Sequence, residues 1–186
     1  MTGLVVWFTG LPSSGKTTLA REVRDQLLAR NLPCCLLDSD EVRDALTPPP
    51  GYDPAGRDAF YATLASLAAL LARQGLTALV AATAHRKAHR EQARTAAPKF
   101  IEVYVDTPLE ECERRDTKGL YRSARAGEIT GMPGLQVAYE APTAPLIVAR
   151  GGSSNSAARD VVAAILSGQS TQEGAAPDRD VAWPSR

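Results

Sequence analysis

The chain has 186 residues, and its 21 lysines and arginines balance its 21 aspartates and glutamates. A chain of this length fits one domain, which buries roughly two thirds of the surface exposed in the unfolded state. The zero net charge excludes a global field that would attract nucleic acid or an anionic membrane. Any anionic ligand must therefore be bound by local geometry.

The three cysteines suit a reducing compartment, because two of them, Cys34 and Cys35, are adjacent and make a poor disulfide framework. Cys112 is interpreted as core packing. The N-terminal run MTGLVVWFTG lacks the basic region of a signal peptide, and no apolar run approaches the roughly 20 residues that a membrane-spanning helix requires. These features predict a cytoplasmic protein with no membrane partner and no nucleic-acid partner.

Short β-branched or aromatic runs alternate with segments of helical periodicity. Strands are predicted at residues 4–9, 34–38, 76–82, 100–105 and 146–148. Helices are predicted at residues 17–30, 41–46, 57–74, 87–97, 109–116 and 157–166, with residues 118–142 irregular. Because parallel strands need crossovers, this order predicts an α/β fold, with a mostly parallel five-stranded sheet covered by helices on both faces. Residues 1–167 are assigned to this domain and the polar residues 168–186 to a disordered tail.

The sequence GLPSSGKT at residues 10–17 fits the pattern G-x-x-x-x-G-K-[ST] between a predicted strand and a predicted helix, the context that this motif needs. In such a loop, backbone N–H groups turn onto phosphate oxygens, and the helix N-terminus adds its positive dipole end. Lys16 is expected to reach the β- and γ-phosphates of ATP, and the Thr17 hydroxyl to bind Mg²⁺. The candidate ATP-binding residues are Gly10, Leu11, Pro12, Ser13, Ser14, Gly15, Lys16, Thr17 and Thr18.

Two alternatives to a phosphate-transferring loop stay open on the motif alone. A glycine-rich turn can hold a lysine by chance, and nucleotide-gated switches carry the same loop without transferring phosphate. The motif therefore predicts nucleotide binding, and catalysis needs further residues.

Acidic residues follow the second predicted strand, where open parallel sheets bind ligands at the carboxyl ends of their strands. A carboxylate of Asp38 or Asp40 can orient an acceptor hydroxyl and take its proton, or hold Mg²⁺, and Arg43 can fork onto an anionic group. The alternative for both aspartates is a capping role at the next short helix. Arg57 is either a site residue or a solvated charge at a helix start.

His85 and His89 are four residues apart, a spacing that places two metal ligands on one face of a helix. No third ligand accompanies them, so a basic surface helix or an anion contact is the preferred interpretation. The neighbouring Arg86, Lys87, Arg90 and Arg94 are interpreted as a solvated face, since the net charge is zero and aromatic residues are few.

Residues 4–150 resemble the adenylyl-sulfate kinases, the P-loop enzymes that make 3′-phosphoadenylyl sulfate from adenylyl sulfate and ATP. The resemblance covers FTGLPSSGKTTLA, the run LLDSDEVRDAL against the family's aspartate-x-aspartate-asparagine-x-arginine stretch, and GYDPAGR. Its most specific part is FIEVYVDTPLEECERRDTKGLYRSARAGEITGMPG followed by YEAP. The resemblance implies the three-layer P-loop kinase fold, sulfate activation and, as is common in the family, a possible homodimer.

Residue roles follow from the resemblance at matching positions. It implies that Asp40 lies beside the acceptor 3′-hydroxyl and the metal, and that Arg43 and Arg57 hold the phosphosulfate. Tyr52 and Met132 stand where the family has phenylalanines, the first of them against the adenine. The remaining positions implied are Asp38 in the acid motif, Lys118, Gly119 and Leu120 in a segment that folds over the substrate, and Arg115, which can approach ATP. Lys16 and Asp40 are the implied catalytic residues.

Departures from the family pattern fall on the acceptor side. Phe60 occupies the position where the family has an asparagine that contacts the acceptor, and Ala62 and Thr63 replace a pair of arginines. The run at residues 83–86, TAHR, replaces serine-proline-tyrosine-arginine. Losing one polar contact to a ligand costs about 1 to 3 kcal/mol, which is enough to retune an acceptor site and too little to abolish phosphate chemistry.

Two alternatives to an adenylyl-sulfate kinase follow from these departures. The first is a related kinase that phosphorylates another nucleotide, such as a cytidine diphospho-compound, because Phe60 and Met132 change the surroundings of base and ribose. The second is a nucleotide-binding regulator without turnover. The intact loop, Asp40 and both arginines argue against the second.

Overall fold

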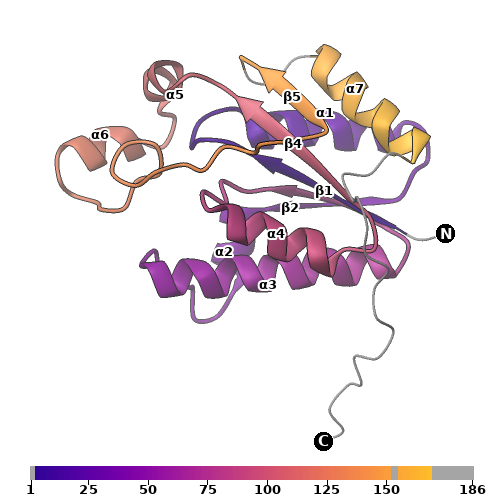
Figure 1. Ribbon diagram of the computed structural model, residues 1–186, viewed down its shortest axis with the longest axis horizontal. Coiled ribbons are helices and arrows are strands. Elements are labelled where there is room, and N and C mark those ends of the chain that lie inside the picture. Colours follow the sequence, from indigo (N-terminus) through magenta and orange to yellow (C-terminus); the bar gives the residue numbers. More distant parts are fainter. Residues whose placement is uncertain (1–2, 152–154, 169–186) are drawn as a thin grey trace, which may run out of the picture.

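The computed structural model describes residues 3–151 and 155–168, which form a parallel sheet between two layers of helices (Figure 1). The strands are β1 (Leu4–Thr9), β2 (Cys34–Asp38), β3 (Thr77–Ala81), β4 (Phe100–Asp106) and β5 (Ile147–Arg150). Their order is β2-β3-β1-β4-β5, and every neighbouring pair is parallel. Val5 pairs with both Ala78 of β3 and Phe100 of β4, so β1 lies at the centre of the sheet.

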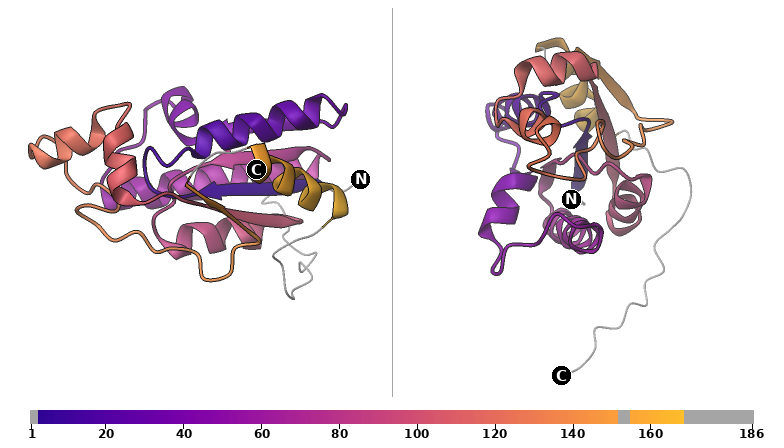
Figure 2. Two further views of the ribbon diagram at one scale, coloured as in Figure 1. Left: turned by 90° about the horizontal axis from the view of Figure 1, so that it is seen from above. Right: turned by 90° about the vertical axis from the view of Figure 1, so that its left-hand side faces the viewer.

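Two pairs of helices cover the faces of the sheet. α1 (Lys16–Leu28) and α7 (Asn155–Ser167) lie on one face, and α3 (Pro54–Arg73) and α4 (Lys87–Ala96) on the other (Figure 1). α2 (Ser39–Ala45) directly follows β2, and α5 (Leu109–Arg115) and α6 (Leu120–Arg125) follow β4. Figure 2 shows α5 and α6 beyond the end of the sheet toward which β1 points. Among the described residues, no helix has the length and apolar character needed to cross a bilayer.

Burial on both faces explains why β1 is apolar at nearly every position. Leu4, Val6 and Phe8 pack with α1 and α7, whereas Val5 and Trp7 face α3 and α4. Strands of parallel sheets are buried on both sides, which requires a continuous apolar run in place of alternation. Burying each large side chain contributes roughly 1.5 to 3 kcal/mol, so β1 anchors the loop that follows it.

The predicted fold class is confirmed, and each predicted strand is present with its ends shifted by at most two residues. Helix α3 starts at Pro54, three residues before the predicted start at Arg57. The Asp53 carboxylate accepts a hydrogen bond from Gly56 N, and proline suits the first helical turn because its missing N–H is not needed there. The tail predicted at residues 168–186 lies, apart from Gly168, outside the described residues.

The prediction that residues 118–142 are irregular is wrong at α6. Asp116 starts this helix, since its carboxylate accepts hydrogen bonds from Tyr121 N and Arg122 N at 3.1 Å each. Tyr121, Ala124 and Met132 then form a small buried cluster with Cys112 of α5. Six helical residues with no apolar repeat gave no periodic signal, so only the tertiary cluster reveals the helix.

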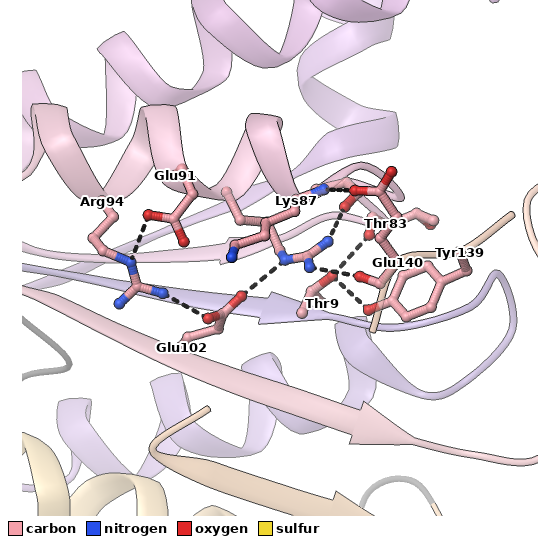
Figure 3. A network of polar contacts seen from close by, with 10 residues as sticks. Thr9, Thr83, Lys87, Glu91, Arg94, Glu102, Tyr139 and Glu140 are labelled. Atoms are coloured by element: carbon pink, nitrogen blue, oxygen red, sulfur yellow. Dashed lines mark hydrogen bonds and ion pairs between the residues drawn. The ribbon is translucent and has the colours of Figure 1, made fainter. Parts of the chain in front are cut away.

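A buried arginine, Arg90, joins three segments beside β4, and Figure 3 shows the neighbouring residues Arg94, Glu102 and Glu140. Arg90 of α4 is 1% exposed, and its Nε donates to Glu102 Oε1 of β4 at 2.8 Å. Its two Nη atoms donate to the carbonyl oxygens of Ala84 at 2.7 Å and Glu140 at 2.6 Å. Arg94 completes the network with a 2.7 Å bond to Glu102 Oε2. Buried charges are tolerated only when paired in this way.

We predict that Arg90→Met lowers the free energy of unfolding by about 3 kcal/mol, because it leaves the buried Glu102 carboxylate and the carbonyl oxygens of Ala84 and Glu140 short of donors. Urea denaturation followed by circular dichroism measures this change. Arg21→Met is the matched control, since Arg21 and Glu41 form an exposed pair, and a loss below about 1 kcal/mol is expected there. Equal losses in the two variants would contradict the structural role of Arg90.

Candidate functional site

The loop at residues 10–17, here named the phosphate loop, runs from the end of β1 to the start of α1. A Cβ atom at Gly10 would lie 2.6 Å from the carbonyl oxygen of Val105, so only glycine lets β4 and the loop approach this closely. Gly15 caps α1 with φ of 101°, which glycine adopts without strain. No side chain of the described residues caps α1, so its first N–H groups are available to an anion.

Lys16 folds back over this loop. Its ammonium donates to the carbonyl oxygens of Leu11 at 2.7 Å and Gly10 at 3.1 Å. Burial lowers the pKa of Lys16 to about 8, although the charges of Cys112, Asp40 and Asp38 partly oppose this effect. The side chain is therefore held where it meets loop-bound phosphates, and added negative charge stabilises its ammonium form.

Two hydroxyl groups complete the phosphate loop. The Ser14 Oγ atom is buried and has no hydrogen-bond partner among the described residues, which leaves a polar atom for a ligand. The Thr17 hydroxyl donates to Asp38 Oδ2 at 2.5 Å. Asp38 also caps α2, because its Oδ1 accepts from Asp40 N at 2.9 Å. Asp38 therefore caps α2, as one of the two interpretations of its sequence position predicts, and its carboxylate also contacts the phosphate loop through Thr17.

Asp40 lies at the first turn of α2 and pairs with Lys118 at 2.6 Å. Both side chains are 57% exposed, so solvent and ligands can reach them. The carboxylate of Asp40 raises the pKa of Lys118 through this hydrogen bond. The negative charge of Asp40 also favours the ammonium form of Lys16 and partly opposes the effect of burial on the pKa of Lys16.

Arg43 lies on α2 together with Asp40, and Arg57 lies near the start of α3. Arg43 is 6% exposed, and its Nη1 atom donates to the carbonyl oxygens of Pro50 and Gly51 at 2.8 and 3.0 Å. Arg57 donates to the carbonyl oxygen of Gly131 at 2.8 Å. Burial raises the pKa of the Tyr61 hydroxyl, and the charges of Arg43, Arg57 and Asp40 all act on it. The acid and both arginines therefore converge on one region.

Residues 116–137, here named the lid segment, lie over the phosphate loop. The Tyr121 hydroxyl donates to the carbonyl oxygen of Pro12 at 3.0 Å. Gly134 packs on Leu11 so closely that an added Cβ atom would lie 2.4 Å from Leu11 Cδ2. Gly119 caps α6 with φ of 68°. The lid segment also contacts α2 through the Lys118–Asp40 pair and α3 through the Arg57 bond to the Gly131 carbonyl oxygen.

The other predicted site residues have mixed placements. Arg115 donates to the carbonyl oxygens of Ser14 at 3.3 Å and Gly151 at 3.2 Å, so it reaches the phosphate loop. Tyr52 is 63% exposed beside Arg43. Met132 is only 4% exposed and packs inside the lid cluster, with Leu120 against it. Thr18 lies on the exposed side of α1.

The two histidines do not share a helix, because α4 begins at Lys87, after His85. Their rings lie 5.4 Å apart, and His89 Nε2 contacts Asp58 Oδ1 at 2.7 Å. Burial lowers the pKa of His85 to about 4, so its ring is neutral at pH 7. Within residues 3–151 and 155–168, no three His, Cys, Asp or Glu side chains are grouped as metal ligands.

Comparison with known proteins identifies the family. The family model described as adenylylsulphate kinase matches residues 2–150. The chain belongs to the adenylylsulphate kinase family. An adenylyl-sulfate kinase of Synechococcus sp. (strain JA-3-3Ab) is 45% identical over 148 residues, covering 80% of this chain and 84% of the relative. A Picosynechococcus sp. relative of the same name is 43% identical over 148 residues, covering 80% of this chain and 84% of the relative.

A solved adenylylsulphate kinase matches the structure along nearly its whole length. It is the Mycobacterium tuberculosis APS kinase CysC in complex with AMPPNP and APS, with a TM-score of 0.84 and 39% sequence identity. The match covers 89% of this chain and 98% of that one. The phosphate loop, Asp40 and the lid segment all lie within the residues that the family model matches.

Sequence reasoning missed two residues that shape this adenylylsulphate kinase site. Tyr121 was not singled out, although it joins the lid segment to the phosphate loop. Arg90 was interpreted as solvated but is buried on Glu102. The signal that could have revealed this pair is Glu102 itself, since a lone carboxylate within the apolar strand run FIEVYV needs a buried cation.

We predict that Lys16 loses its proton with a midpoint near pH 8, which is far below an ordinary lysine, because burial disfavours its charge. Competitive labelling with acetic anhydride, read by mass spectrometry of the Lys16 peptide, measures this midpoint. Lys118 serves as the internal control, since its pKa is raised and its midpoint should lie above that of an ordinary lysine. Added ATP should move the Lys16 midpoint upward. A midpoint above pH 10 without nucleotide would refute the prediction.

Proposed function

We infer that this protein is an ATP-dependent adenylyl-sulfate kinase. It transfers the γ-phosphoryl group of ATP to the 3′-hydroxyl of adenylyl sulfate and forms 3′-phosphoadenylyl sulfate and ADP. Family membership and the match to a kinase whose structure holds AMPPNP and APS support this function. The observation that carries it is the contact between the phosphate loop and the start of α2, where Asp38 accepts from Thr17 and from Asp40 N on the helix that also carries Arg43.

The phosphate loop is proposed to bind the ATP phosphates. The N–H groups at the start of α1 and the unpartnered Ser14 hydroxyl are available to phosphate oxygens. Lys16 leaves the carbonyl oxygens of Gly10 and Leu11 and places its ammonium on the β- and γ-phosphates. Arg115 approaches from α5, where it already contacts the Ser14 carbonyl oxygen.

The donor set beside the loop fits Mg²⁺, which prefers oxygen ligands. Thr17 supplies a hydroxyl, Asp38 is hydrogen-bonded to that hydroxyl, and Asp40 is the next carboxylate along. Thr17 and Asp40 are proposed to hold the ion, with Asp38 orienting Thr17. When bound, Mg²⁺ supplies charge compensation for the β- and γ-phosphate oxygens during transfer.

Asp40 is proposed to act on the acceptor. Its carboxylate accepts a hydrogen bond from the 3′-hydroxyl and takes the proton as the acceptor oxygen bonds to the γ-phosphorus. The bond from that phosphorus to the β,γ-bridging oxygen breaks on the opposite side, and ADP leaves. Arg43 and Arg57 bind the anionic phosphosulfate. Because the Lys118 ammonium pairs with the Asp40 carboxylate in this structure, Lys118 must move away when the acceptor hydroxyl binds to Asp40.

The lid segment is proposed to exclude water from the transfer. Its contacts with the phosphate loop through Tyr121 and Gly134 place it over the nucleotide site. A closed site keeps water from taking the phosphoryl group in place of the acceptor.

Further expectations from the sequence extend this proposal. The three cysteines of the described chain are free, which is consistent with the cytoplasmic location that we propose. A homodimer is also proposed, and the exposed Leu70 on α3 offers an apolar contact for it. The rival functions, a kinase for another nucleotide and a regulator without turnover, are less well supported than adenylyl-sulfate phosphorylation by the identities to curated adenylyl-sulfate kinases.

We predict that Asp40→Asn lowers kcat with adenylyl sulfate by about 10² to 10⁴, because the amide cannot take the hydroxyl proton. A coupled ADP-release assay with ATP and Mg²⁺ measures this loss. Asp44→Asn, an exposed aspartate on the same helix, is the matched control and should retain turnover.

The same assay separates the rival functions. A panel of AMP, CMP and cytidine diphospho-compounds is compared with adenylyl sulfate. Turnover on another member of the panel, with none on adenylyl sulfate, would establish a different acceptor. ATP binding without any product would favour a regulator.

We also predict that Thr17→Val raises the Mg²⁺ concentration for half-maximal turnover about tenfold or more, since valine keeps the shape but removes the hydroxyl ligand. Thr17→Ser keeps the hydroxyl and should stay close to the unmodified protein. Steady-state rates over a Mg²⁺ titration at saturating ATP measure both. An unchanged requirement in Thr17→Val would remove Thr17 from the metal site.

A further inference from the structure

Two aromatic rings enclose the guanidinium of Arg43. Its Cζ atom lies 3.9 Å from the centroid of the Phe60 ring and 4.4 Å from that of Tyr52. Both distances are well inside the range of cation–π attraction. In the described chain the two rings make no contact with each other, which is the arrangement expected of rings on opposite faces of one planar group. We call Tyr52, Arg43 and Phe60 the aromatic clamp.

Phe60 is the fixed side of the clamp. Its ring is 2% exposed, belongs to the core cluster between α3 and the sheet, and packs on Tyr61 with centroids 5.5 Å apart. Tyr61 is fixed in turn, because its hydroxyl accepts a hydrogen bond from Ala84 N at 3.0 Å. The face that Phe60 offers to Arg43 therefore belongs to the rigid core.

Tyr52 is the exposed side of the clamp. Its ring is 63% exposed, but Arg43 holds the loop that carries it through bonds to the carbonyl oxygens of Pro50 and Gly51. Asp53 fixes the other end of this loop at the start of α3. One Tyr52 face covers the guanidinium, and the remaining surface of the ring stays accessible to a ligand.

The hydrogen bonds of Arg43 leave part of its donor set unused. Within the described chain only Nη1 has hydrogen-bond partners, the two loop carbonyl oxygens, so Nε and Nη2 remain available as donors. A guanidinium held between two rings keeps its plane and presents these donors in one orientation. Such preorganisation strengthens binding of an anion because less side-chain entropy is lost on contact.

We propose that Phe60 is a positioning residue that fixes the plane of Arg43, and that it thereby determines how tightly the anionic end of the acceptor is held. This proposal rests on the proposed function, in which Arg43 binds the phosphosulfate. It also gives a role to the phenylalanine at a position where an amide is the family pattern. The chain replaces a direct polar contact with support for a neighbouring arginine.

The test compares two phenylalanines whose rings each lie against an arginine guanidinium. Phe60→Leu keeps the bulk but removes the π face, and we expect KM for adenylyl sulfate to rise about tenfold, with kcat and KM for ATP within about twofold. Phe100→Leu is the matched control, because Phe100 is fully buried and Arg94 lies 4.8 Å from its ring centroid, at the start of β4 and away from the site. The control should lower the thermal midpoint without changing KM for the acceptor.

A second measurement needs no acceptor. Two aromatic faces shield the protons between them, so the Arg43 Nε–H signal in a ¹H–¹⁵N spectrum should lie upfield of ordinary arginines, assigned by its absence in Arg43→Lys. Phe60→Leu should move it downfield. An ordinary chemical shift in the unmodified protein overturns the clamp, even if the leucine variant does not fold.

The outcomes separate the two proposals. An unchanged KM for adenylyl sulfate in Phe60→Leu, with only a lower thermal midpoint, overturns the positioning role. No turnover of adenylyl sulfate by the unmodified protein refutes the proposed function and with it the role in acceptor affinity, whereas a shielded Arg43 signal lost in Phe60→Leu would still support the clamp itself.

Discussion

The geometry of the site depends on one buried cation, the guanidinium of Arg90. It has acceptors on β4, on the connection between β3 and α4, and on the chain that returns from the lid segment. Taking a charge out of water is costly, so this arrangement is stable only with every acceptor in place. The neighbouring Tyr139 lies within hydrogen-bond distance of Thr9 at the end of β1, which brings the same return chain to the start of the phosphate loop.

The charge distribution explains how a chain with no net charge can bind two polyanionic substrates. Lys16, Arg43, Arg57 and Lys118 gather around the carboxyl ends of β1 and β2, and Asp40 acts on several of them. In this structure these cations donate to backbone carbonyl oxygens and to Asp40. Substrate binding thus exchanges internal partners for phosphate and sulfate oxygens, and few new groups need to be brought in.

Much of this site could be predicted from sequence because its signals are local. The phosphate loop has a fixed spacing next to a buried strand, and the acids after β2 fall where parallel sheets bind ligands. The partners of Arg90, Arg43 and Met132 could not be predicted, because neither a motif nor a periodic pattern specifies these contacts. A solvated arginine and a buried one share the same helical spacing, and only tertiary contacts distinguish them.

The lid segment shares a small core with Cys112 of α5. Cys112, Tyr121, Ala124 and Met132 form a cluster separate from the two clusters that pack on the sheet, and Leu11 of the phosphate loop touches it from outside. Breaking the contacts at its margin therefore leaves most of its apolar surface covered. The apolar packing of the lid segment is thus separate from that of the sheet, so loss of its contacts with the phosphate loop would leave both sheet clusters intact.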